Sequence, residues 1–227
     1  MSKKNDNPVA KSTVEQINST LNSLIIKKLA ITCNYVASVN LPDHRTQITW
    51  NNHVSGRANS GSYFTKLNQY LHILTNNSYH CLLFDGSLLR VNFEFKNNLL
   101  LTQNLLWWPA PFDNEYIEML AEFAAADIVE DFFEDNDWHK KIKMRSPIRI
   151  DFDSSNNTST HPQSHMHIQH EDTRLNTNEP ICFNRFVDFI FRNFYPDYNF
   201  SFSEYDYIRY RIPQYRKIEY IASQVNI

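Results

Sequence analysis

Apolar residues recur at helical spacing in several parts of the chain. Ser12 and Glu15 fit a capping box, and apolar residues then return every three or four positions to about Leu29. The same periodicity predicts further helices over residues 63–74, 117–132 and 184–194. These segments would supply three or four amphipathic helices.

Between these segments, apolar and polar residues alternate as in strands. This pattern predicts strands at residues 47–50, 79–84, 89–95, 99–107 and 202–212. Asp85-Gly86 is typical of a type I′ turn and would join two of them, and Asn97-Asn98 would turn the chain again. The result would be a three-stranded meander with one apolar face.

The order of these elements predicts an α+β fold. We expect a mainly antiparallel sheet with three to four helices packed on it. No repeat, low-complexity segment or linker divides the chain. The prediction is therefore a flexible tail at residues 1–10 and a single domain over residues 11–227.

The most informative alternation lies in residues 145–153 and 161–168. Ile148, Ile150 and Phe152 fall on one face of the first segment, as do Met166 and Ile168 in the second. If the two strands pair with their apolar faces aligned, the opposite face carries Arg149, Asp151, Asp153, His165 and His167. A loop rich in Ser, Asn and Thr joins the strands and ends at His161-Pro162.

This shared face has the residue types of a metal or acid–base site. His165, His167 and Asp151 could hold a divalent metal ion, with His161 or Asp153 as general base. Arg145 and Arg149 could contact a phosphate. The alternative is a polar sheet surface, on which the arginines pair with Asp151 or Asp153.

Three other motifs have a functional and a structural interpretation. Asp85 with Glu94-Phe95-Lys96 is similar to the carboxylate and E-x-K pattern of metal-dependent nucleases, or else a turn residue and an exposed strand face. Trp107-Trp108 is either a core anchor or a docking patch for a partner. Tyrosines and arginines in 205–217 could stack and bind single-stranded nucleic acid, or could cover the core.

Composition excludes several classes of protein. With three glycines, the chain lacks a glycine-rich phosphate loop and a G-x-S-x-G nucleophile elbow. A formal net charge of -3 gives no overall attraction to nucleic acid or to an anionic membrane. The three cysteines have no C-x-x-C spacing and are expected to be reduced thiols. The polar start and the absence of a long apolar run predict a cytoplasmic protein without a membrane segment.

Several blocks of the sequence together resemble one family. They are the Asp85-Gly86 hairpin and residues 107–111, 144–153, 161–167 and 185–195. Over about residues 15–220 the chain is similar to the bacterial domain-of-unknown-function family twenty-two ninety. That resemblance implies a role in a two-gene anti-phage defence locus with a helicase partner, and it supplies no catalytic residues. His170 departs from the pattern, which has a small residue there.

These observations lead to a functional hypothesis with two alternatives. The chain would be an anti-phage component that acts with a helicase and cleaves DNA or RNA by metal-assisted chemistry at the His/Asp face. Alternatively, it would be a non-catalytic subunit that regulates or loads the helicase through its aromatic patches. A third possibility is a toxin that is neutralised by its neighbour.

Overall fold

A computed structural model describes residues 7–50, 66–112, 114–120, 122–170, 172–213 and 224–225. Its helices are α1 (Pro8–Ile26), α2 (Leu67–Thr75), α3 (Asn114–Met119), α4 (Ala125–Glu134) and α5 (Phe183–Phe194). Its strands are β1 (Ala30–Cys33), β2 (Val36–Leu41), β3 (Arg45–Trp50), β4 (Cys81–Leu83), β5 (Leu88–Lys96), β6 (Leu99–Trp108), β7 (Ile148–Asp153), β8 (Ser164–Ile168), β9 (Leu175–Thr177) and β10 (Gln224–Val225).

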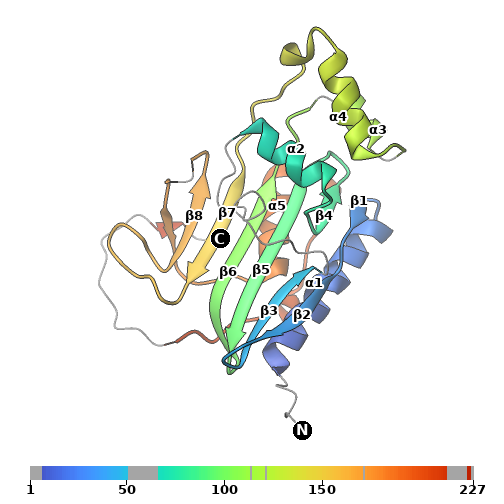
Figure 1. Cartoon of the computed structure of the whole chain (residues 1–227). Helices are drawn as coiled ribbons and strands as arrows, with labels where there is room; N and C mark the ends of the chain where they lie inside the picture. The colour runs from blue at the N-terminus through green and yellow to red at the C-terminus, as the bar shows by residue number, and fades with distance from the viewer. Residues whose placement is uncertain are drawn as a thin grey trace.

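In the described part of the chain, all ten strands belong to one sheet (Figure 1). The order is β1-β4-β5-β6-β7-β8-β9-β10, while β2 pairs with β3 and β3 pairs with the far end of β5. Every pair is antiparallel except β9 with β10. The predicted α+β fold with a mainly antiparallel sheet is confirmed. Strands β1, β2, β9 and β10 were not expected.

The two faces of the sheet are covered differently. Helices α1 and α5 lie behind the sheet in Figure 1 and bury a large apolar core against it. A smaller core lies on the front face, where α2, α3 and α4 cover only one end of the sheet. Trp107 contributes to the first core and Trp108 to the second, because successive residues of a strand point to opposite faces. Both are buried, so the docking-patch interpretation of Trp107-Trp108 is wrong.

Helix α1 begins earlier than expected. The side chain of Asn7 caps it by accepting a hydrogen bond from the amide of Ala10, and Pro8 occupies the first turn. Thr13, which was expected to lie at the start of the helix, is buried inside it and donates its hydroxyl to the carbonyl of Val9. The capping box at Ser12 is therefore wrong, and residues 8–10 are helical instead of belonging to a tail.

The type I′ turn geometry expected at Asp85-Gly86 is found instead at Asn97-Asn98. Asn97 and Asn98 both have positive φ (50° and 64°), as a type I′ turn requires. At Asp85-Gly86 only Gly86 does (φ 77°), and the amide of Leu83 bonds the carbonyl of Ser87 across a three-residue loop. A Cβ on Gly86 would lie 3.0 Å from that of Ala110, so this close approach also favours glycine.

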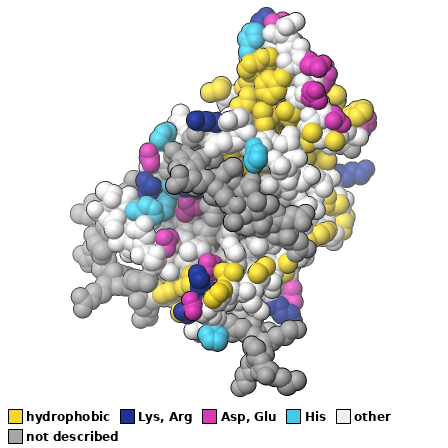
Figure 2. Space-filling model, viewed as in Figure 1, with side chains coloured by type: hydrophobic (Ala, Val, Ile, Leu, Met, Phe, Trp, Pro, Cys, Tyr) yellow, Lys and Arg dark blue, Asp and Glu magenta, His cyan; other side chains and the backbone are white. Residues whose placement is uncertain are grey.

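The single helix expected over residues 117–132 is wrong. It is divided into α3 and α4, which fold against each other so that the rings of Tyr116 and Phe132 lie 4.9 Å apart. A continuous helix would separate them by about 24 Å. Figure 2 shows hydrophobic side chains on the surface above these helices, and Phe123 and Phe133 are among the exposed apolar residues.

The strand expected over residues 202–212 is also wrong. The amide and hydroxyl of Ser203 both donate to the carboxylate of Asp206, which closes a short 3-10 turn (Glu204–Asp206). A single bridge connects Arg211 to Leu99. Tyr205 is almost fully exposed, and Tyr210 packs on Phe93 and Phe95. The predicted aromatic and basic strand surface does not form, and its last members lie outside the described residues.

Among the described residues, the three cysteines are free thiols, as expected. No helix in the same part of the chain combines the length and apolarity needed to cross a bilayer.

Candidate functional site

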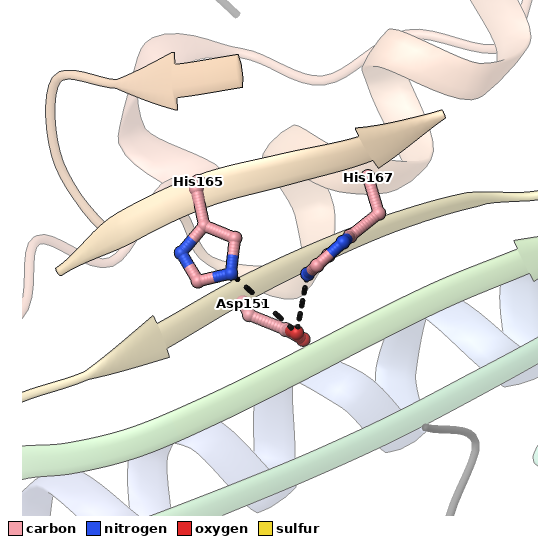
Figure 3. Close-up of side chains that lie close together, drawn as sticks. All are labelled: Asp151, His165 and His167. Atoms are coloured by element: carbon pink, nitrogen blue, oxygen red, sulfur yellow. Dashed lines mark hydrogen bonds and ion pairs between the residues drawn. The ribbon is translucent and has the colours of Figure 1, made fainter. Parts of the chain in front are cut away.

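The predicted hairpin of β7 and β8 forms in the expected register. Asp151 lies opposite His165, and Arg149 lies opposite His167. On the other face, Ile150 lies opposite Met166 within the core under α1 and α5. Alternation therefore places the charged and imidazole side chains together on the front face, as Figure 3 shows for Asp151, His165 and His167.

Three of these side chains are close enough to share an ion. The Oδ2 atom of Asp151 lies 3.1 Å from Nε2 of His167 and 3.9 Å from Nε2 of His165. One potential ligand atom from each residue falls within 4.8 Å of the others. Two imidazoles with one carboxylate suit a transition metal such as Zn²⁺ or Mn²⁺ better than a cation that takes only oxygen ligands. The group could therefore hold a metal ion.

His165 is oriented as metal-bound histidines usually are. Its Nδ1 lies 2.7 Å from the carbonyl oxygen of Pro162 and must donate to it, which leaves the Nε2 lone pair facing Asp151. The ring is almost completely buried, and burial lowers the pKa of His165 to about 4. The imidazole is therefore neutral near pH 7, the state that can bind a metal.

Asp151 is held as a carboxylate. Burial raises its pKa, but the hydrogen bond with His167 and the charge of Arg149 outweigh burial and hold the pKa below its ordinary value. Its second oxygen accepts a hydrogen bond of 2.6 Å from the side-chain amide of Asn104 on β6. One fifth of the Asp151 side chain is exposed, which gives solvent access to a site whose two histidines are buried.

Arg149 is the group that competes for these ligand atoms. Its guanidinium lies 2.8 Å from Oδ2 of Asp151 and 2.9 Å from Nε2 of His167. The guanidinium thus contacts the same two atoms that a metal ion would bind. Of the two interpretations offered for this arginine, the structure shows the pair with Asp151. An ion could enter only if Arg149 moved aside.

The other predicted site residues lie at different distances from this group. His161 is adjacent, with its ring edge-on to that of His165 at 4.7 Å, and its buried Nδ1 has no hydrogen-bond partner among the described residues. Asp153 instead accepts hydrogen bonds from the amide and hydroxyl of Ser155 and shapes the loop. Arg145 pairs with Asp85, at 3.2 Å, away from the group. His170 is exposed beyond the end of β8.

The E-x-K interpretation is wrong, because its parts are not brought together. Glu94 pairs with Arg45 at 2.9 Å near the end of β5. Asp85 precedes the start of the same strand and so lies about 20 Å away, given the rise of roughly 3.3 Å per residue. Among the described residues, neither carboxylate belongs to a cluster that could hold a metal ion.

Sequence reasoning missed a polar row that crosses the sheet at this site. Asn92 of β5 lies opposite Asn104 of β6, Asn104 opposite Asp151, Asp151 opposite His165, and His165 opposite Asn176 of β9. The available signal was the alternation of Asn92 with Val91 and Phe93, whereas Asn104 follows the polar residues Thr102 and Gln103. That alternation gave the face that Asn92 occupies but not the partner strand.

Most of the chain matches one known protein family. A family model described as "Uncharacterized conserved protein (DUF2290)" matches residues 30–219. The chain belongs to this family. All seven of the predicted site residues lie within the matched part of this DUF2290 protein. No curated protein and no solved structure matches the chain. Its site must therefore be interpreted from its own geometry.

Proposed function

We propose that this DUF2290 protein is a metal-dependent nuclease effector that acts with a helicase in two-gene anti-phage defence. The observation that carries the catalytic part is the group of Asp151, His165 and His167, in which His165 is neutral and already oriented by Pro162. The defence role and the helicase partner rest on the family resemblance described from the sequence. The substrate would be DNA or RNA opened by that helicase.

Each residue of the site would then have a defined task. A metal ion bound by Asp151, His165 and His167 would supply Lewis-acid polarisation of a phosphodiester and a water of lowered pKa. Asn104 keeps the Asp151 carboxylate oriented through its unused oxygen. His161, which lies beside His165, would accept the proton of the attacking water. Arg149, displaced from Asp151, would pair with the substrate phosphate.

A second function, a non-catalytic subunit that regulates or loads the helicase, is favoured by one observation. Arg149 already neutralises Asp151 and contacts His167, so the buried charges are satisfied within the protein. On this alternative the polar group is structural. Because Trp107 and Trp108 are buried, helicase contact would have to use another surface.

A cleavage assay separates the two functions. The purified protein would be incubated with single- and double-stranded DNA and RNA, with and without the helicase, in Mn²⁺, Zn²⁺, Mg²⁺ or chelator. We expect ion-dependent cutting that falls at least about 100-fold in His165→Ala/His167→Ala, because two of three ligands are lost.

The matched control is His139→Ala/His170→Ala, which removes two exposed histidines from outside the group. This variant should cut like the wild type. Thermal unfolding of each variant would show that the fold is kept. If no ion supports cutting even with the helicase present, the protein is the non-catalytic subunit.

A further inference from the structure

A cavity of about 350 Å³ opens at the end of the β7–β8 hairpin, next to the proposed metal site. It lies between the start of α2 and the segment that leads into β7, and Figure 1 shows α2 on the front face at that end of the sheet. Its lining residues are Lys66, Leu67, Tyr70, Trp108, Pro109, Pro111, Ile142, Lys143, Met144, Arg145, Ser146, Pro147 and Gln169. The cavity and the metal ligands share one face of the sheet.

The lining combines positive charge with apolar walls. Lys66, Lys143 and Arg145 contribute three cationic groups, and the described lining contains no carboxylate. This is unusual in a chain whose formal net charge is -3. A phosphate would be attracted by the cations, whereas aromatic, proline and methionine side chains offer contacts that a phosphate alone does not use. The lining therefore fits a nucleotide better than a simple anion.

Arg145 is positioned by the fold. One of its nitrogens lies 3.2 Å from Asp85, which also accepts hydrogen bonds from the amide of Ser87 and the hydroxyl of Tyr195. Among the described residues, this pair uses one of the five donors of the guanidinium. Such an arginine keeps its direction while retaining donors for an incoming phosphate oxygen.

The cavity lies close to the metal site along β7. Pro147 lines it, and Arg149 follows two residues later, a distance of roughly 7 Å along an extended chain. Gln169, which follows the end of β8, also lines it and is two residues beyond His167. A strand of nucleic acid seated in the cavity could therefore continue over Arg149 to Asp151 within a few nucleotides.

We propose that this cavity binds one nucleotide of a single-stranded nucleic acid and guides the strand to the Asp151 site. Its volume admits a nucleotide with an unpaired base but not a base pair within a duplex. Base contacts come from the apolar walls, and phosphate contacts come from Lys66, Lys143 and Arg145. The inference rests on the proposed function for the cutting step, and strand binding itself needs no metal.

Binding is measured as fluorescence anisotropy of labelled single-stranded DNA, single-stranded RNA and duplex DNA, with chelator present so that no cutting occurs. We expect the wild type to prefer single strands. Lys66→Gln/Lys143→Gln/Arg145→Gln should bind at least tenfold more weakly, and the slope of log K against log salt should fall by about 0.7 for each phosphate contact that is removed. Lys66→Gln/Lys143→Gln, which spares the Asp85 contact, should show an intermediate loss.

The control removes three positive charges from the opposite side of the sheet: Lys11→Gln/Lys28→Gln/Arg192→Gln. It should bind nearly as tightly as the wild type. Equal weakening in both triple variants, preference for duplex, or full competition by inorganic phosphate would overturn the proposal. If the cavity variants lose binding but the wild type never cuts, this proposal stands and the nuclease function fails. If the cavity variants cut and bind normally while His165→Ala/His167→Ala does not cut, the nuclease function stands and the cavity proposal fails.

Discussion

The two faces of the β7–β8 hairpin show how one alternating sequence serves two purposes. On the face toward α1 and α5, Ile150 and Met166 pair as parts of a packed apolar core. On the other, Asp151 and His165 pair, and His165 is as well buried as its apolar neighbours. Burying charged and imidazole groups brings less stability than burying apolar ones. Stability therefore does not explain why polar residues occupy this face of the hairpin.

The largest effect should separate these faces by mutation. Ile150→Ala removes a fully buried side chain and should lower the free energy of unfolding by about 3 kcal/mol, with cleavage per folded molecule unchanged. Its neighbour Asp151→Asn should abolish cleavage per folded molecule, and it also destabilises the fold because the buried guanidinium of Arg149 loses its counter-charge. Urea denaturation and the cleavage assay measure both. Similar losses of cleavage in the two variants would show that the site depends only on the integrity of the fold.

The next effect is a dependence of stability on pH that arises on the polar face. The pKa of His165 is about 4 in the folded protein and about 6.5 in the unfolded chain. Between these values the unfolded chain binds a proton that the folded protein does not, so stability falls as pH falls through this window. For metal-free protein, the loss between pH 7 and pH 5 should be about 2 kcal/mol.

Urea denaturation at the two pH values checks this expectation, with His165→Asn as the comparison. The variant lacks the imidazole, so its free energy of unfolding should fall by about 2 kcal/mol less than that of the wild type between pH 7 and pH 5. An identical pH dependence in the two proteins would mean that His165 becomes protonated without cost in the folded state.

The smallest expected effect concerns the competition between Arg149 and an ion. Arg149→Gln removes the guanidinium from Oδ2 of Asp151 and Nε2 of His167, and should tighten Mn²⁺ or Zn²⁺ binding about tenfold, equivalent to 1.4 kcal/mol. Isothermal titration calorimetry measures it, with Arg145→Gln as a control outside the group. Weaker binding in Arg149→Gln would instead make this arginine a positioning residue for the ligands.

The sequence was sufficient for those parts of the fold that depend on local pattern. Alternation in β7 and β8 gave both faces and the shared site, since neighbouring strands joined by one loop have few possible registers. Helix α5 was also predicted nearly as observed, because its apolar stripe is wide and Pro196 follows it.

Features that depend on distant parts of the chain could not be predicted. Asn104 bonds Asp151 across 47 positions of sequence, and no local pattern specifies that pairing. The division of α3 from α4 follows from the packing of Tyr116 on Phe132, which overrides a helical periodicity. The E-x-K motif failed for a different reason: Asp85 and Glu94 lie near opposite ends of one strand, so the rise per residue alone separates them.

One irregularity of the sheet has a consequence for engineering. The register between β5 and β6 shifts at one point. Glu94 pairs with Thr102, but the next residue of β5, Phe95, pairs with Leu100. Leu101 is therefore an extra residue on β6, which forms a β-bulge. Beyond this bulge, the orientation of Asn104 is fixed by its pairing with Asn92 and Asp151. The Asn97-Asn98 hairpin tip is thus decoupled from the site. A fluorophore or an inserted tag at that tip could report on the protein while leaving Asn104 in phase with Asp151.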